Sequence, residues 1–402
     1  MTNEEILFKD NQEYNERKQD VHDLFIERFG IEPTDYFSSS GRIELLGNHT
    51  DHNHGRVLTS AVNLDMLAAT TKRADNKVIA YSKGYEVMEV DIDDLSMHQE
   101  EVSKSIGMIR GCLKGMKDLG YNIGGFNLFM NSTVFGGAGV SSSAAFELLF
   151  CEVLNYYYND DKASRVDMAK ASQYSEVNYF GKPCGLLDQM AISLGGVNHI
   201  DFFDVENPVI EHVEPVLEGY DIVIVNTGGD HSNLTSHYAD IKDDMKKVSN
   251  YFNKDYLSEI DEKEFYAELP GIRKFAKGRA ILRAIHFFDE NKRVDIAYKA
   301  LQNNDIETFL KCINASGESS YKLLQNCYYG GDKEQGVTLG LTLSKKVLRN
   351  GAVRVHGGGF AGTILAFVKK EQTSGYVTLM NKVFGDNNAV VVNLRPLGST
   401  HL

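Results

Sequence analysis

The chain has 402 residues, enough for two domains, and its 42% hydrophobic and 24% charged residues are typical of a globular protein. A formal net charge of -14, with no run of five basic residues, argues against nucleic acid or an anionic membrane surface as a partner. No apolar run reaches the roughly 18 residues of a membrane span, and the acidic first residues do not form a signal peptide. Five scattered cysteines without C-x-x-C spacing fit a reduced protein, so we expect a cytoplasmic location.

Strand-like runs alternate with helix-like runs along the chain, which predicts an α+β fold. Short β-branched runs bounded by Gly or Asn predict strands over residues 76–82, 124–132, 220–227, 351–357, 362–368 and 388–394. Apolar residues at helical spacing predict helices over residues 142–158, 164–180, 273–290 and 294–304. A polar, irregular stretch near residues 200–225 predicts a division into two domains, residues 1–215 and 216–402.

The stretch GRIELLGNHTDHNHG (41–55) concentrates side chains that form hydrogen bonds, and no hydrophobic period covers its second half. Packing alone does not require such a segment, so we expect it to hold a ligand. The hydrogen-bonding residues are Arg42, Glu44, Asn48, His49, Thr50, Asp51, His52, Asn53 and His54.

In STVFGGAGVSSSAAFE (132–147), an apolar strand leads into glycines, then three serines, then a helix. Glycines let backbone N–H groups approach a ligand, and the first turn of a helix offers unpaired N–H groups and the positive end of its dipole. This pattern favours a phosphate site over a flexible turn with an ordinary N-cap. The Walker pattern G-x-x-x-x-G-K-[ST] does not occur.

Two further stretches are ambiguous by themselves. In GKPCGLLDQMAISLGG (181–196), Asp188 lies in an apolar setting, which suits either a catalytic base with a cationic partner or the N-cap of a helix over 189–194. In RVHGGGFAGT (354–363), glycines between two strands allow the backbone to come close to another group, or form a plain hairpin. The stretches 250–272 and 325–336 suggest no function.

The order of these motifs resembles the galactokinase family of the GHMP small-molecule kinases. Residues 41–55 are similar to the family's sugar signature, usually GRVNLIGEHTDYNGG, and the serine loop is similar to its GLSSSAS phosphate loop. GGGF and NTGGDHSNLTSHY (226–238) also resemble family segments. The resemblance spans residues 40 to about 370. It implies a two-lobed α+β fold with mixed sheets flanked by helices, in which ATP and a sugar bind in the cleft between lobes.

The resemblance further implies a galactose 1-kinase that uses ATP and Mg²⁺, acts on a small sugar, binds neither nucleic acid nor membrane, and is a monomer or weak homo-oligomer. Asp188 would be the catalytic carboxylate and Arg42 its partner, while Ser143 and Glu176 would hold the metal ion. Phosphate would bind at Gly136, Gly137, Ala138, Gly139, Ser141, Ser142 and Ser143. The sugar would contact Asn48, His49, Asp51, His52, Gly185 and Tyr238, with Gly358 and Gly359 close to the site.

The sugar signature departs from the family pattern. Asn48 replaces a Glu, Glu44 replaces an Asn, and His52 replaces a Tyr. The arginine pair that usually follows the pocket tyrosine is absent, and Asp240 and Ile241 stand near its place. In the family, the Glu at position 48 accepts a hydrogen bond from the C6 hydroxyl of galactose. Asn at that position, with His nearby, would tolerate a carboxylate at C6. The alternative substrate is therefore a hexuronate such as galacturonate.

Two other classes of function are weighed against a sugar kinase. A non-catalytic sensor of ATP and sugar would be expected to lose part of the serine loop or of the catalytic set, but Ser141–Ser143 and Asp188 are intact. A kinase for a non-sugar acceptor such as mevalonate or homoserine would not need the sugar signature. Both features favour an active sugar kinase.

Overall fold

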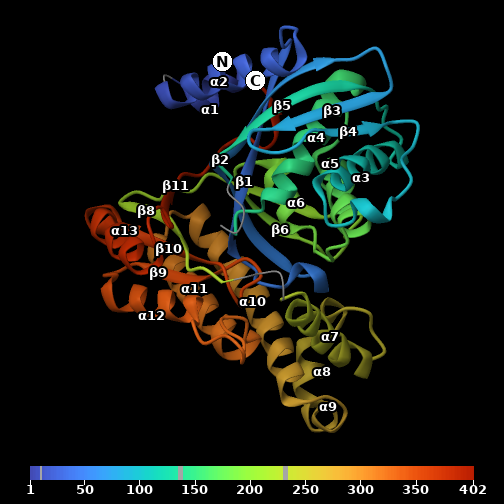
Figure 1. The fold of residues 1–402 in the computed structure, drawn as a ribbon. Helices are drawn as coiled ribbons and strands as arrows, with labels where there is room; N and C mark the ends of the chain where they lie inside the picture. Colours follow the sequence, from blue (N-terminus) through green and yellow to red (C-terminus); the bar gives the residue numbers. More distant parts are fainter. Residues whose placement is uncertain (10, 135–138, 230–233) are drawn as a thin grey trace.

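The computed structural model describes residues 1–402 except 10, 135–138 and 230–233. An N-terminal lobe and a C-terminal lobe each contain one sheet, as Figure 1 shows. This arrangement and its strands and helices confirm the predicted α+β class. Within the described residues, none of the helices is both long enough and apolar enough to cross a membrane.

The N-terminal lobe contains an eight-stranded mixed sheet, ordered β12-β1-β2-β5-β3-β4, with β6 paired to β2 and β7 to β6. Among the strands of the described residues, β3 and β5 pair in parallel and the other pairs of this sheet are antiparallel. The strands are β1 (Asp35–Leu46), β2 (Arg56–Lys72), β3 (Lys77–Ser82), β4 (Met88–Asp91), β5 (Phe126–Ser132), β6 (Val197–Asp201), β7 (Val209–Val213) and β12 (Thr400–His401).

Helices cover both faces of this sheet. One face carries α3 (Ser105–Asp118), α4 (Ser142–Asn159), α5 (Arg165–Tyr174) and α6 (Leu187–Leu194) (Figure 1). On the other face, α2 (Gln12–Phe29) packs Val21 and Phe25 against Leu67 and Phe129, and α1 (Asn3–Phe8) precedes it. The last strand, β12, pairs with β1 and brings the C-terminus back beside the N-terminus.

The C-terminal lobe contains a four-stranded antiparallel sheet ordered β11-β8-β10-β9. Its strands are β8 (Tyr220–Asn226), β9 (Ala352–His356), β10 (Thr363–Lys369) and β11 (Ala389–Val392). The accompanying helices are α7 (Thr235–Tyr251), α8 (Glu262–Ala267), α9 (Leu269–Phe275), α10 (Gly278–Gln302), α11 (Ile306–Ser319), α12 (Gly336–Val347) and α13 (Lys370–Phe384). Short 3-10 or π turns cover Asp51–Asn53, Gln99–Glu101, Ser175–Phe180, Leu257–Glu259 and Ser320–Leu324.

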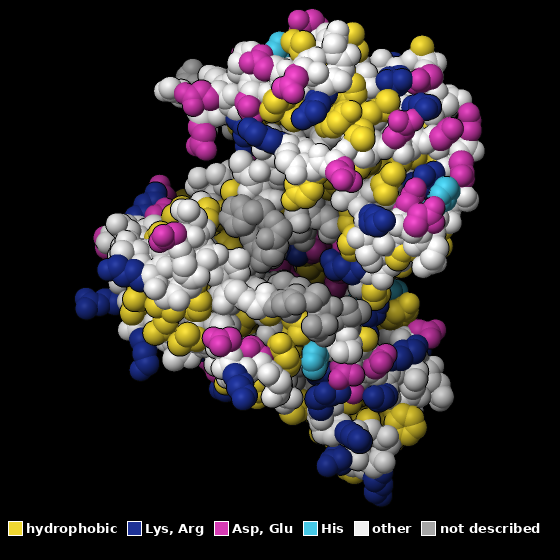
Figure 2. All heavy atoms as spheres, viewed as in Figure 1, with side chains coloured by type: hydrophobic (Ala, Val, Ile, Leu, Met, Phe, Trp, Pro, Cys, Tyr) yellow, Lys and Arg dark blue, Asp and Glu magenta, His cyan; other side chains and the backbone are white. Residues whose placement is uncertain are grey.

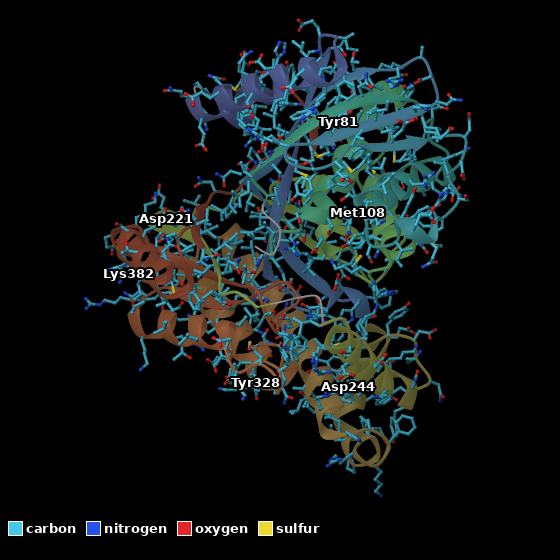
Figure 3. All side chains as sticks on the ribbon, in the orientation of Figure 1. Tyr81, Met108, Asp221, Asp244, Tyr328 and Lys382 are labelled. Carbon is cyan, nitrogen blue, oxygen red and sulfur yellow. The ribbon has the colours of Figure 1, made fainter. Side chains whose placement is uncertain are left out.

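Each of the six predicted strands is present, whereas β1 and β2 were missed because they are buried along most of their length and show no alternation. The two helices predicted over 273–290 and 294–304 are largely one, because α10 runs without a break from Gly278 to Gln302, whereas residues 273–275 belong to α9. Charged pairing holds α10 to α7: Asp244, labelled in Figure 3, accepts from Arg279 at 2.5 Å and Arg283 at 2.9 Å. These helices form the lower part of the C-terminal lobe.

Candidate active site

Arg42 and Asp188 form a two-pronged ion pair. Arg42 projects from β1 and Asp188 from the first turn of α6, and Nε and Nη2 of the guanidinium donate to Oδ1 and Oδ2 of the carboxylate at 2.7 Å each. Arg42 Nη1 also donates to the Gly139 carbonyl, and Ser141 Oγ donates to Asp188 Oδ2. The pair therefore links the sugar-signature strand, the glycine–serine loop and α6.

Asp188 is held as a carboxylate. Burial raises its pKa, but the charge and hydrogen bonds of Arg42, with the Ser141 hydroxyl, outweigh burial and bring the pKa below its ordinary value. The alternative of an N-cap is wrong, because Leu186 is the N-cap of α6 and Asp188 lies inside the helix. With 30% of its side chain exposed, the carboxylate is open to a ligand.

The glycine–serine loop ends at a helix start without a side-chain cap. Ser141 adopts φ +58° at the N-cap of α4, and its side chain does not cap the helix. The first N–H groups of α4 are therefore without a side-chain acceptor and suit an anion. A Cβ at Gly139 would lie 2.0 Å from Thr363 Oγ1 of the other lobe, so only glycine fits this contact. Gly136, Gly137 and Ala138 lie outside the described residues.

The predicted metal ligands lie side by side. Ser143 Oγ donates to Glu176 Oε1 at 2.9 Å, and Glu176 also accepts from Lys182 at 2.7 Å and from Gln189 at 2.8 Å. A hydroxyl and a carboxylate at the N-terminal end of α4 are hard oxygen ligands, and Mg²⁺ in phosphoryl-transfer sites commonly uses one or two of these. The Lys182 side chain is 55% exposed, so it is free to move if a cation replaces its ammonium.

Asp51 of the sugar signature packs against Gly185. Its Oδ1 accepts from the His52 N–H at 2.9 Å, and its Oδ2 lies 3.4 Å from the Leu187 N–H. A Cβ at Gly185 would lie 1.7 Å from Asp51 Oδ2, so the carboxylate occupies the space that any side chain at 185 would need. Burial and the nearby Asp188 raise the pKa of Asp51. A cavity of about 450 Å³ borders these residues on the side of α7.

Three successive carbonyls of the glycine turn accept hydrogen bonds from predicted pocket residues. Asn48 Nδ2 donates to Gly357 at 2.8 Å, His49 Nε2 to Gly358 at 3.0 Å, and the Tyr238 hydroxyl to Gly359 at 3.1 Å. The turn is also the hairpin between β9 and β10, so both interpretations of its sequence hold. The carbonyls of Gly357 and Gly358 provide part of the contact between the sugar signature and the C-terminal lobe.

His49 and His52 are neutral and engaged with each other. Because the Gly358 carbonyl only accepts, His49 Nε2 carries the proton, and its Nδ1 accepts from His52 Nε2 at 3.2 Å. His52 Nδ1 then accepts from Asn53 at 2.9 Å. Burial lowers the pKa of His49 to about 4 and that of His52 well below its ordinary value. Neither ring carries a charge at neutral pH.

Asn48 is 1% exposed, and protein groups occupy both ends of its amide. Besides Gly357, Nδ2 donates to Glu44 Oε1 at 3.0 Å, while Oδ1 accepts from Asn326 Nδ2 at 2.8 Å. The expectation that Asn48 contacts the sugar directly therefore finds no support in this geometry.

A hollow with acidic and basic side chains inside it lies between the two lobes in Figure 2.

Comparisons with known proteins identify the family of this chain. A model of the galactokinase galactose-binding signature matches residues 23–72, and one of the GHMP kinase N-terminal domain matches residues 107–196. The galactokinase of Clostridium perfringens is 32% identical over 373 residues, which cover 90% of this chain and 92% of that protein. The chain belongs to the galactokinase family. This family member is an ATP-dependent sugar kinase, as the resemblance predicted.

Further relatives and solved structures support membership of the galactokinase family. The galactokinase of Lactobacillus helveticus is 31% identical over 96% of this chain and 95% of that protein. The structure of Lactococcus lactis galactokinase complexed with galactose superposes with a TM-score of 0.82 at 27% identity, covering 96% and 99% of the two chains. A mevalonate kinase structure, with a TM-score of 0.62 at 14% identity over 90% and 99%, shares the fold alone.

The sequence of this galactokinase-family chain did not reveal every polar residue behind the site. Arg354 donates to Glu44 Oε1 at 2.5 Å, and His286 lies 2.9 Å from the Asn48 carbonyl. Asn326 comes from a stretch without a sequence interpretation. Arg354 stands beside the glycine motif and was a visible signal, whereas His286 inside a long helix and a single Asn in a loop were not.

Proposed function

We propose that the chain transfers the γ-phosphoryl group of ATP to the anomeric hydroxyl of D-galactose, yielding galactose 1-phosphate and ADP. The observation that carries the proposal is the Arg42–Asp188 pair, which contacts Ser141 at the start of α4 on one side. Asp188 lies on α6, and the Leu187 N–H of the same helix points to Asp51 of the sugar signature. An acceptor held at the signature would place a hydroxyl beside an ionised carboxylate and a bound phosphate.

Asp188 acts mainly by orientation and charge. Its low pKa makes it a weak base, so it attracts and aligns the hydroxyl proton while the new bond from sugar oxygen to phosphorus forms. Arg42 keeps the carboxylate ionised and lies where negative charge on the transferring group needs stabilisation. Phosphoryl transfer depends on such positioning and charge neutralisation more than on covalent help from the protein.

Nucleotide phosphates bind at Gly139, Ser141 and Ser142 and at the open N–H groups of α4. Ser143 and Glu176, which lie within hydrogen-bond distance of each other, would hold Mg²⁺. The ion, when bound there, neutralises the charge of the phosphate oxygens. Lys182, which donates to Glu176, would then be free to pair with the negative charge of the nucleotide phosphates.

Galactose fits the pocket better than a hexuronate. A carboxylate at C6 would need a positive or donating group, but the Asn48 amide is bonded to protein at both ends and His52 is uncharged at neutral pH. The neutral sugar requires no such charge. Asp51, with Gly185 behind it, and Tyr238 provide the remaining polar contacts.

The test is ATP-dependent phosphorylation of galactose and galacturonate in parallel, with Mg²⁺, compared by kcat/KM. We expect galactose to be favoured by about tenfold or more. A preference for galacturonate would show that the departures at Asn48 and His52 changed the substrate. Binding of sugar and ATP without turnover would instead identify a sensor, and Asp188→Asn supplies the inactive reference.

The sugar and ATP are the only partners that this function requires. The cytoplasmic location and the monomer or weak homo-oligomer expected from the sequence stay predictions. The division into domains 1–215 and 216–402 is part of the same proposal, since the chain passes from β7, which ends at Val213, to β8, which begins at Tyr220.

A further inference from the structure

Asn326 lies completely buried behind the glycine turn, at the start of a stretch for which the sequence suggests no role. Its Nδ2 donates to Asn48 Oδ1 at 2.8 Å and to the Gly358 carbonyl at 3.1 Å. Its own carbonyl accepts from Phe360 N–H at 2.5 Å. One residue of the C-terminal lobe therefore holds two positions of the turn, Gly358 and Phe360, and also the sugar signature.

The direction of these hydrogen bonds is set by an ion pair. Arg354 always carries its protons, so Glu44 accepts from it and has only acceptor oxygens left for Asn48. Asn48 must then turn Nδ2 toward Glu44, which leaves Oδ1 facing Asn326. Asn326 must in turn present Nδ2. Arg354 and Glu44 thus fix the orientation of two amides in a row.

The far end of this row reaches residues that line the pocket. The Gly358 carbonyl accepts from Asn326 and from His49 at once, and the adjacent carbonyls accept from Asn48 and Tyr238. A shift of the turn would therefore displace His49 and Tyr238 together. None of these bonds reaches the Arg42–Asp188 pair, so chemistry and sugar positioning are separable.

We propose that Asn326 and Asn48 are positioning residues for the sugar: their amides, oriented by the Arg354–Glu44 pair, lock the glycine turn against the sugar signature and so place His49 and Tyr238. The proposal rests on the sugar kinase function proposed above. It assigns selectivity for the sugar partly to a residue that never touches it.

Steady-state kinetics with galactose and ATP test the proposal in Asn326→Asp, which keeps the size of the side chain but loses both donors. We expect KM for galactose to rise about tenfold or more, with KM for ATP within about twofold of wild type. Asn326→Ala should give the same split, and Asn326→Ser, which retains one donor, should recover part of the loss. Wild-type KM for galactose in both Asp and Ala variants, or equal rises in both KM values, would overturn the proposal.

A matched control separates positioning from simple loss of stability. Asn198 on β6 is also buried, and its Nδ2 donates to the Gly195 carbonyl at 2.7 Å, away from the site. Asn198→Asp should lower Tm while leaving both KM values unchanged. If Asn198→Asp raised KM for galactose as much as Asn326→Asp, the effect would be one of stability and the proposal would fail.

Failure of the proposed function can be told apart from failure of this inference. Turnover of galactose by the wild-type protein tests the proposed function. If the wild type did not phosphorylate galactose, the Tm values of Asn48→Ala, Asn326→Ala and the double variant would still test the inference that the two amides act together. A double-variant loss smaller than the sum of the single losses supports the row of amides, and a strictly additive loss overturns it.

Discussion

Asn48→Glu restores the residue of the usual sugar signature but places it beside another carboxylate. Asn48 Nδ2 is 3.0 Å from Glu44 Oε1, and the two residues are 1% and 5% exposed. Two like charges about 4 Å apart repel by about 4 kcal/mol at an effective dielectric constant of about 20. Arg354 is already paired with Glu44 and offsets only part of this repulsion. We therefore expect the free energy of unfolding at pH 7 to fall by about 2–4 kcal/mol.

The exchange of both residues should be less harmful than either change alone. Glu44→Asn leaves the buried Arg354 without a carboxylate, which costs about 3–5 kcal/mol. Glu44→Asn/Asn48→Glu keeps one carboxylate and one amide, so we expect it to recover at least half of the larger single loss. Urea unfolding of the four proteins measures this. The reasoning is refuted if Asn48→Glu is as stable as wild type, or if the double exchange loses the sum of the single losses.

Three further predictions follow from the site. Asp188→Asn should lower kcat by about 10²–10⁴ with little change in KM for the sugar, measured in a coupled ADP assay, whereas an unchanged kcat would remove Asp188 from the chemistry. Gly185→Ala should raise KM for galactose about tenfold or more, because its Cβ would lie 1.7 Å from Asp51 Oδ2, while Gly278→Ala, which meets nothing within 4 Å, should leave KM unchanged. His49 has a folded pKa of about 4 against 6.5 unfolded, so the unfolded state binds the proton first as pH falls. Unfolding free energy should drop by about 3 kcal/mol between pH 7 and pH 4 from this group, and a His49→Gln variant with the same pH slope would contradict the assignment.

Local chemistry made some features visible in the sequence. Strands such as β8 and β10 carry β-branched runs bounded by turn residues, and α4 follows glycines and serines with helical spacing. These patterns depend on neighbours a few residues away. In contrast, β1 and β2 contain buried polar residues such as Ser38 and Asp65, whose burial is favourable only once partners from elsewhere in the chain, Arg17 and Arg395, bond to them.

The sequence by itself determined the family, the order of the motifs and the residue types of the phosphate and sugar sites, because glycine geometry and hydrogen-bonding capacity are properties of the residues. Only the tertiary structure decided which groups pair. Arg42 pairs with Asp188, which lies 146 residues later in the chain. The Asn48 amide points away from the pocket because it is hydrogen-bonded to Glu44 and Asn326. An unpaired polar atom in the interior costs free energy, so the role of a buried amide such as that of Asn48 depends on the partners that folding brings to it, and here those partners come from both lobes.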